Sequence, residues 1–106
     1  MSGCGHPSGD ALPVADELEA ASALFAAMAH PARLLALVAL GRRGPMSAGD
    51  LAAITGLEQS AMSHQLRALR RARLILDERR GRRVIYRLAD HHVSHLVEDA
   101  LAHAAE

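Results

Sequence analysis

Several residue types are scarce in this chain, and their scarcity limits what it can be. Its 106 residues include one cysteine, Cys4, which excludes an internal disulfide and fits a reducing compartment. Tryptophan is absent, and Phe25 and Tyr86 are the only aromatic residues. The core must therefore be built from Leu, Ala, Val, Ile and Met, which favours helix over sheet. This length predicts one compact domain rather than two.

Long hydrophobic runs are also missing. No apolar stretch approaches the length that spans a bilayer, and the N-terminus lacks the basic start and apolar run of a signal peptide. We therefore expect a soluble, cytoplasmic protein with no membrane partner. No combination of nucleophile and base is evident either, which argues against a small metal-dependent hydrolase.

Lysine is absent as well, and the arginines are unevenly distributed. Nine of the twelve arginines lie between Arg67 and Arg87, and with Asp77 and Glu78 as the only acids there this segment carries +7. Residues 1–30 and 88–106 each hold four acidic residues and no arginine, so each end carries −4. A basic block within a neutral chain indicates a polyanion-binding surface, and the acidic ends indicate another task.

The first part of the chain divides into an arm and a helix. Residues 1–12 are rich in Gly, Ser and Pro and predict a flexible arm, with the folded domain over residues 13–106. Cys4 and His6 are either part of an untethered tail or an auxiliary pair of metal ligands. An apolar seam with helical spacing then follows, which predicts packing in the core or at a dimer interface. The seam contains Val14, Leu18, Ala21, Phe25 and Met28.

Two further helices are expected before residue 56. His30-Pro31 should end the first helix and begin the second, which assigns His30 a structural role rather than a ligand role. The second helix is expected to end by Gly41, and its predicted apolar face holds Leu34, Leu35 and Val38, with Leu37 as a further candidate. Ser47 and Asp50 resemble a capping box that opens a short third helix, which Gly56 stops.

Residues 54–75 (ITGLEQSAMSHQLRALRRARLI) predict a turn and an amphipathic helix. If Glu58 opens this helix, Met62, Leu66 and Leu69 share one buried face. The polar residues around them predict a recognition helix that reads base edges in a DNA major groove and contacts phosphates near its end. The predicted DNA contacts on this helix are Gln59, Ser60, Ser63, His64, Gln65, Arg67 and Arg70.

A β-hairpin is expected directly after the recognition helix. Residues 74–80 and 82–88 are β-prone segments on either side of Gly81, and arginines flank the turn. Arg79, Arg80, Arg82 and Arg83 could reach phosphates or an adjacent minor groove. A short helix, a turn, a second helix and this hairpin together indicate a winged helix-turn-helix, although a solvated basic turn is the alternative for an isolated hairpin.

Residues 90–106 (DHHVSHLVEDALAHAAE) predict a final helix with Asp90 at its start. Beside an apolar seam runs a stripe of potential metal ligands, which includes His95 and Asp99. His92 and His103 lie eleven residues apart, about 16 Å along a helix, so one helix cannot gather both around one ion. In a two-fold dimer, Asp90 and His92 of one protomer can meet His103 and Glu106 of the other.

Two nitrogen and two carboxylate donors suit Zn(II), and with added ligands also Ni(II) or Co(II). The alternative is a solvated helix edge, to which we mainly assign His91 and His95.

Three segments carry a resemblance to a known family. They are residues 27–35 (AMAHPARLL), 58–69 (EQSAMSHQLRAL) and 81–88 (GRRVIYRL). They resemble the second helix, recognition helix and wing of the ArsR/SmtB family of winged helix-turn-helix metal sensors. The resemblance implies a mainly α fold of four helices, a β-hairpin wing and a final helix. It also implies a homodimer through the first and last helices that binds an imperfect palindrome in double-stranded operator DNA.

The same resemblance implies how metal would act. Family members with a site on the last helix use the pattern Asp-x-His, ten residues, then His-x-x-His or His-x-x-Glu, which here falls on Asp90, His92, His103 and Glu106. Metal binding usually releases such proteins from DNA.

Other family features bear on which metal is sensed. Ser47 and Gly49 occupy the positions of the family's other site, a cysteine pair, so sensing of arsenite, lead or cadmium there is not expected. Cys4, His6 and His95 are candidate auxiliary ligands for the higher coordination numbers of nickel and cobalt sensors. The alternative function is a metal-independent winged-helix regulator or one controlled by a partner protein, and a co-regulator is compatible with either function.

Overall fold

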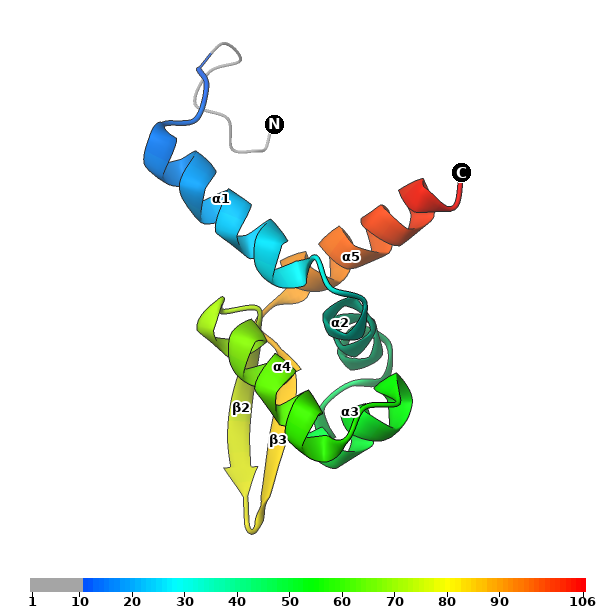
Figure 1. Cartoon of the computed structure of the whole chain (residues 1–106). Coiled ribbons are helices and arrows are strands. Elements are labelled where there is room, and N and C mark those ends of the chain that lie inside the picture. Colours follow the sequence, from blue (N-terminus) through cyan, green and yellow to red (C-terminus); the bar gives the residue numbers. More distant parts are fainter. Residues whose placement is uncertain (1–10) are drawn as a thin grey trace.

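The computed structural model describes residues 11–106 and contains five helices and three strands within them (Figure 1). In chain order these are α1 (Ala15–Met28), α2 (Pro31–Arg43), β1 (Met46–Ser47), α3 (Ala48–Thr55), α4 (Gln59–Arg71), β2 (Ile75–Arg80), β3 (Arg83–Leu88) and α5 (His91–Ala104). The predicted order of four helices, a hairpin and a final helix is confirmed. The two-residue strand β1 is an addition. Cys4 and His6 of the predicted arm lie outside the described residues.

The core lies around α2, which contacts every other helix and β3. Burial of aliphatic side chains from these elements is the main driving force for folding, because the core contains almost no aromatic surface. Its largest fully buried side chains are Leu37, Leu51, Met62, Leu66, Leu69, Ile75 and Val97.

The predicted apolar face of α2 was partly wrong. Leu37 is fully buried, whereas Leu35 is 41% exposed, and Leu34 and Val38 are half-buried. Leucine or valine occupies several sides of this helix, so apolar spacing alone leaves its rotation undetermined. The surrounding elements decide which side is buried.

The predicted end of α2 was also wrong. Gly41 lies inside the helix, which continues to Arg43 and is capped by Gly44 with φ 87°. A Cβ atom at Gly41 would lie 3.2 Å from Ser94 Oγ and 3.3 Å from Leu88 Cδ1. Gly41 therefore permits close packing of α2 against α5 and β3, and it does not stop the helix.

The predicted caps around α3 are confirmed. Ser47 Oγ accepts a hydrogen bond from the Asp50 backbone N–H at 3.1 Å, and Asp50 Oδ2 accepts from the Ser47 N–H at 3.3 Å. Gly56 follows α3 with φ 77°, in the left-handed region that glycine adopts without strain. His30 caps α2, with its Nδ1 accepting from the Ala32 N–H at 3.2 Å, and this confirms its structural role.

The strands form a three-stranded antiparallel sheet in the order β1-β3-β2. Tyr86 of β3 pairs with Asp77 on one side and with Met46 of β1 on the other. Gly81, with φ 62°, lies at the turn between β2 and β3. Because β1 leads directly into α3, the base of the hairpin is held beside the start of that helix.

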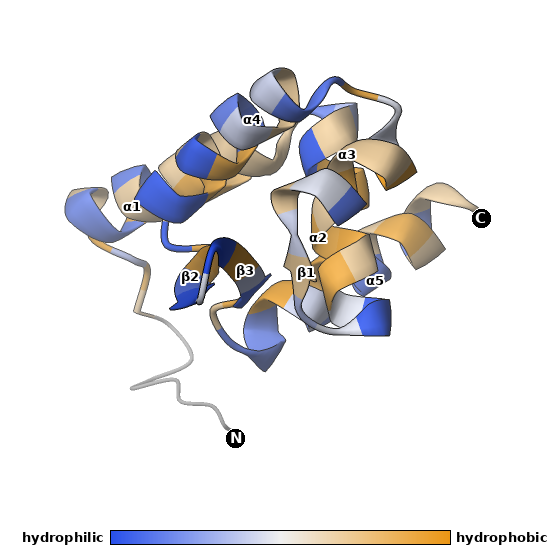
Figure 2. Cartoon of the chain, turned by 90° about the horizontal axis from the view of Figure 1, so that it is seen from below, coloured by the Kyte–Doolittle hydropathy of each residue, from blue (hydrophilic) through white to orange (hydrophobic). Residues whose placement is uncertain are grey.

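The molecule has two contrasting ends. α1 and α5 extend from the end opposite to the tip of the β2–β3 hairpin (Figure 1). Val14, Leu18 and Phe25 of the α1 seam are each more than half exposed, and only Met28 is buried. The seam is therefore mostly outside the core of the single chain. Hydrophilic residues instead cover the hairpin and the outer turns of α4 (Figure 2).

None of the helices in residues 11–106 is by itself long and apolar enough to cross a membrane. α1 and α2 pass that test only as a pair, by length and composition, with a bend of 93° between them.

Candidate nucleic-acid interface and candidate metal centre

The apolar face of α4 holds the helix in place. Met62, Leu66 and Leu69 are fully buried, as their spacing predicted, and Glu58 is the N-cap residue. The opposite face is therefore presented to solvent, and Ser60, His64 and Arg67 on it are exposed. Such a face offers hydrogen-bond donors and acceptors on a rigid element, as base reading requires.

Gln65 lies on a different side of α4 and has a partner within the protein. Arg33 Nε of α2 donates to Gln65 Oε1 at 2.7 Å, and Arg33 Nη1 donates to the carbonyl oxygen of Ala27 at 3.1 Å. All three groups are partly buried. Arg33 therefore links the end of α1 to the recognition helix. The predicted role of Gln65 in DNA binding remains a prediction.

The arginines of the wing differ in their surroundings. Arg80 Nε lies 3.4 Å from Glu78 Oε2, and Arg83 Nη2 lies 3.5 Å from Asp50 Oδ2. Arg79 and Arg82 have no ion pair within residues 11–106. All four are exposed and flank the turn at Gly81, so they form a cationic tip suited to phosphates.

Asp50 is an acidic group outside the wing that contacts this tip, through Arg83. Hydrogen bonds from Ser47 hold the pKa of Asp50 below its usual range, and the charge of Arg83 lowers it further. Asp50 is therefore ionised at neutral pH, and its charge offsets part of that of Arg83.

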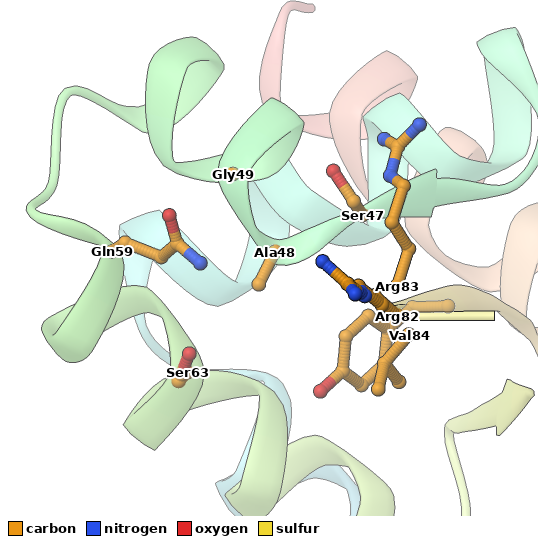
Figure 3. Close-up of a pocket in the computed structure, with 9 residues that line it drawn as sticks. Ser47, Ala48, Gly49, Gln59, Ser63, Arg82, Arg83 and Val84 are labelled. Carbon is orange, nitrogen blue, oxygen red and sulfur yellow. The ribbon is translucent and has the colours of Figure 1, made fainter. Parts of the chain in front are cut away.

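A cleft of about 430 Å³ lies between the start of α3, α4 and the wing, and we call it the wing cleft (Figure 3). Figure 3 shows Gln59 and Ser63 of α4 on one side of it and Arg82, Arg83 and Val84 of the wing on another. Its lining residues are Ser47, Ala48, Gly49, Gln59, Ser63, Arg82, Arg83, Val84 and Tyr86. The structure thus brings predicted base readers and predicted phosphate binders around one depression.

Sequence reasoning missed Tyr86 as a lining residue. A second cleft, of about 290 Å³, lies farther along α4, and Tyr86 and Ser63 line both clefts. The signal available in the sequence was the strand period, because Val84 and Tyr86 share one face of β3. The other side of the cleft comes from residues 47–49, which hairpin periodicity alone does not locate.

Arg70, a predicted phosphate binder, is paired within the protein. Its Nη1 lies 2.9 Å from Asp77 Oδ2 of β2, at the second cleft. The pair joins the end of α4 to the wing and offsets one positive charge.

We expect Asp77→Asn to strengthen binding to any DNA duplex. The substitution releases Arg70 and removes a negative charge from each protomer, and exposed charge contacts of about 0.2–1 kcal/mol each predict roughly a 2- to 30-fold gain per dimer. Fluorescence anisotropy on a mixed-sequence duplex measures this gain. Asp16→Asn on α1 is the control with the same change in charge, and equal affinities of the two variants would contradict the prediction.

The four predicted metal ligands lie at the two ends of α5. Asp90 is the N-cap residue, and its Oδ1 accepts from the His92 N–H at 2.9 Å and lies 3.3 Å from His92 Nδ1. This contact leaves His92 Nε2 available as a ligand. His103 lies in the last turn and Glu106 just beyond the helix, and both are exposed.

Two imidazoles and two carboxylates are ligand types that suit a divalent transition metal, but the four groups do not come together within one chain. The part of the chain that the structure describes contains no group of three or more His, Cys, Asp or Glu residues that could hold an ion. This agrees with the spacing argument, since His92 and His103 are about 16 Å apart along α5. Asp90, His92, His103 and Glu106 are all exposed within residues 11–106, so a second copy could approach them.

The remaining histidines of α5 cluster at its start. The His91 ring stacks on His92 with centroids 4.3 Å apart, and its edge contacts His95 at 5.4 Å. Both residues are exposed. The assignment of His91 to a solvated face and the auxiliary role of His95 stay predictions.

α5 is tied to α2 by an ion pair at the helix surface. Arg42 donates to both carboxylate oxygens of Glu98, at 2.7 and 2.8 Å. The Arg42 guanidinium lowers the pKa of Glu98, and Glu98 in turn raises the pKa of Arg42. The helix that carries the predicted metal ligands is therefore linked to the central helix.

Comparisons with known proteins show where these features recur. Residues 30–76 match the family described as bacterial regulatory protein, arsR family. The transcriptional regulator NmtR of Mycobacterium tuberculosis is 47% identical over 78 residues, which cover 74% of this chain and 64% of NmtR. The chain thus aligns with just under two thirds of that relative. The transcriptional repressor SmtB of M. tuberculosis is 39% identical over 100 residues, which cover 94% of this chain and 73% of SmtB.

A solved structure supports the fold. The homodimeric winged helix-turn-helix DNA-binding domain of Mb0332 from Mycobacterium bovis, described as a possible ArsR-family transcriptional regulator, superposes with a TM-score of 0.81. It is 28% identical, and the match covers 93% of this chain and 91% of that one.

Proposed function

Because this chain belongs to the ArsR/SmtB family of winged helix-turn-helix transcriptional regulators, we propose that it is a metal-responsive regulator of transcription. In this proposal a homodimer binds double-stranded operator DNA in the cytoplasm. Zn(II), Ni(II) or Co(II) bound between the C-terminal helices changes its affinity for that DNA. Dimerisation, DNA binding and metal sensing are assigned to residues 13–106.

The observation that carries the proposal is the separation of two kinds of surface. The polar face of α4 and the arginines of the wing lie at one end of the molecule, and the exposed apolar faces of α1 and α5 extend from the other (Figure 1). The metal ligands lie on α5. DNA binding and metal binding can therefore occur together and influence each other through the packing between these ends.

The proposed dimer covers apolar surface that the single chain leaves in water. Leu18, Phe25, Leu96 and Leu101 are between 39% and 56% exposed. An apolar cleft of about 260 Å³ lies between α1 and α5 and is lined by Phe25, Met28, Ala29, Leu34, Leu96, Val97 and Ala100. Exposed apolar surface of this extent is typical of an interface. A two-fold axis there would also bring opposite ends of the α5 helices together.

DNA recognition is assigned to α4 and the wing. The exposed face of α4 offers Ser60, His64 and Arg67 to base edges, with Gln59, Ser63 and Gln65 beside them. Phosphate contacts are assigned to Arg70, Arg79, Arg80, Arg82 and Arg83. Two copies of α4 held about 34 Å apart would read half-sites separated by one helical turn.

Asp90 and His92 of one protomer, with His103 and Glu106 of the other, would hold each metal ion. A bound divalent ion would supply bonds that join the two protomers and favour one dimer geometry. Cys4 and His6 are candidate additional ligands. The effect of metal on α5 could reach the DNA-binding helix α4 through two contacts of α2. Arg42 of α2 binds Glu98 of α5, and Arg33 of α2 binds Gln65 of α4. A tenfold preference of metal for one geometry corresponds to about 1.4 kcal/mol per site.

A DNA titration of the metal-free dimer, repeated with Zn(II), Ni(II) and Co(II), tests the function. We expect at least a tenfold change in operator affinity with one or more of these metals. The operator can be selected from a pool of random duplexes. Unchanged affinity under every metal would refute sensing and favour a metal-independent regulator or one controlled by a partner. Failure to bind any duplex would refute the DNA-binding role.

A further inference from the structure

We propose that the wing cleft seats a phosphate of the DNA backbone and that the Tyr86 hydroxyl donates a hydrogen bond to it. This inference rests on the proposed function and adds a DNA contact that neither the sequence patterns nor the comparisons assign. It also divides α4 between two roles. Ser60 and His64 on its outer face would read bases. Gln59, Ser63 and Arg67, which the proposed function groups with base reading, line the clefts beside the wing and would instead lie next to the backbone.

The shape and charge of the surface favour a strand of phosphates. The wing cleft and the second cleft are neighbours along α4, since Ser63 and Tyr86 border both, and we call the two clefts together the trough. Arginines line it from both sides: Arg67, Arg70 and Arg71 from α4, and Arg82 and Arg83 from the wing. A linear polyanion such as one DNA strand matches a trough with cations on both walls.

Tyr86 has the features of a preorganised donor. Its half-buried ring packs against the hydrophobic core from the central strand β3, which is paired on both sides. Its hydroxyl has no hydrogen-bond partner within residues 11–106, although the phenolic O–H of a packed tyrosine usually has one. Because Tyr86 lines both clefts of the trough, a phosphate bound there would lie next to its side chain.

Phosphate is a better match than a base edge for this position. The trough follows the groove between α4 and the wing, whereas the exposed residues Ser60 and His64 lie on the outer face of α4. Ser63 and Gln59 add neutral polar groups to the same trough (Figure 3). Neutral hydroxyl and amide donors commonly contact the backbone beside arginines and help to fix the register of the protein on the duplex.

Tyr86→Phe tests the proposal because it removes only the hydroxyl and keeps the ring that packs in the core. The probe is a mixed-sequence duplex of about 30 base pairs, long enough for two half-sites. Loss of one hydrogen bond of average net strength in each protomer predicts roughly 30-fold weaker binding by the dimer. Because the hydroxyl is uncharged, the slope of log affinity against log salt should not change.

Ser94→Ala, which removes a half-buried hydroxyl from α5 on the other side of the core, is the control and should bind like the parent. Thermal unfolding of each variant shows that the fold is retained. An equal loss on a selected operator and on the mixed duplex is expected for a phosphate contact. A loss confined to the selected operator would overturn the assignment, since it would indicate base reading.

The result separates this proposal from the proposed function. If the parent binds duplex DNA and Tyr86→Phe binds equally well, the phosphate seat is refuted and DNA binding stands. If the parent binds no duplex, the proposed function is refuted together with the inference.

Discussion

Arg82→Gln combined with Arg83→Gln is expected to weaken binding to any duplex on the order of a hundredfold. The two residues lie at the tip of the wing and line the wing cleft. A dimer loses four cationic contacts, and exposed charge contacts of roughly 0.7 kcal/mol each sum to about 2.8 kcal/mol. The loss should be similar for specific and mixed sequences, because phosphate contacts carry no sequence information.

The salt dependence gives a second measure of the same change. Each phosphate neutralised by the protein contributes about −0.9 to the slope of log affinity against log salt, so four lost contacts should make the slope shallower by up to about 3.6. Arg43→Gln at the end of α2 removes one positive charge per protomer away from the wing, half of the change in the double variant, and should leave the slope nearly unchanged. A double variant with the slope of the parent would contradict the assignment.

Asp50 should increase the effect of losing Arg83. Its pKa is lowered first by hydrogen bonds from Ser47 and only then by the charge of Arg83. Asp50 therefore stays ionised at neutral pH after the substitution, and its unpaired negative charge then faces the DNA. Arg83→Gln alone should accordingly weaken binding more than Arg82→Gln alone, because Arg82 has no acidic partner within residues 11–106.

Helices with one apolar face could be predicted from the sequence. α4 is polar apart from a few positions, so Met62, Leu66 and Leu69 determine its rotation without ambiguity, and all three are fully buried. The cap formed by Ser47 and Asp50 was predictable for a similar reason, since both partners lie within one helical turn. Local spacing is sufficient where the interacting groups are close along the chain.

Features that depend on packing between distant segments could not be predicted in this way. Leucines on several sides of α2 leave its rotation open, and the close approach of α5 explains Gly41 better than any local signal. Arg33 and Gln65 are 32 residues apart, so their hydrogen bond appears only in the fold. The wing cleft likewise joins residues 47–49 to residues 82–86 through the pairing of β1 with β3.

His103→Ala is expected to abolish the response of DNA binding to metal. Each of the two proposed sites in a dimer loses one of four ligands, and even outer-shell changes at metal sites cost about 10- to 100-fold in affinity. If metal changes the operator affinity of the parent by about 1.4 kcal/mol per site, the two sites together give roughly a hundredfold effect. At metal concentrations that saturate the parent, the variant should bind operator DNA with the same affinity as it does without metal.

Competition with a chromophoric chelator measures metal affinity, and a DNA titration measures the response. His91→Ala is the matched control, because His91 is an exposed histidine on the same helix that we assign to the solvated face. It should leave both measurements unchanged. A metal response in His103→Ala equal to that of the parent, or its loss in His91→Ala, would refute the proposed ligand set.

A mixed dimer tests whether the sites lie between protomers. One chain carries Asp90→Ala and His92→Ala, the other carries His103→Ala and Glu106→Ala, and neither homodimer has an intact site. In the antiparallel arrangement the heterodimer regains one complete site, formed by Asp90 and His92 of the second chain and His103 and Glu106 of the first. Random exchange of equal amounts should make about half of the dimers mixed, each binding one ion. No recovery of tight binding on mixing would refute the interprotomer site, because ligands supplied within one protomer would leave every dimer defective.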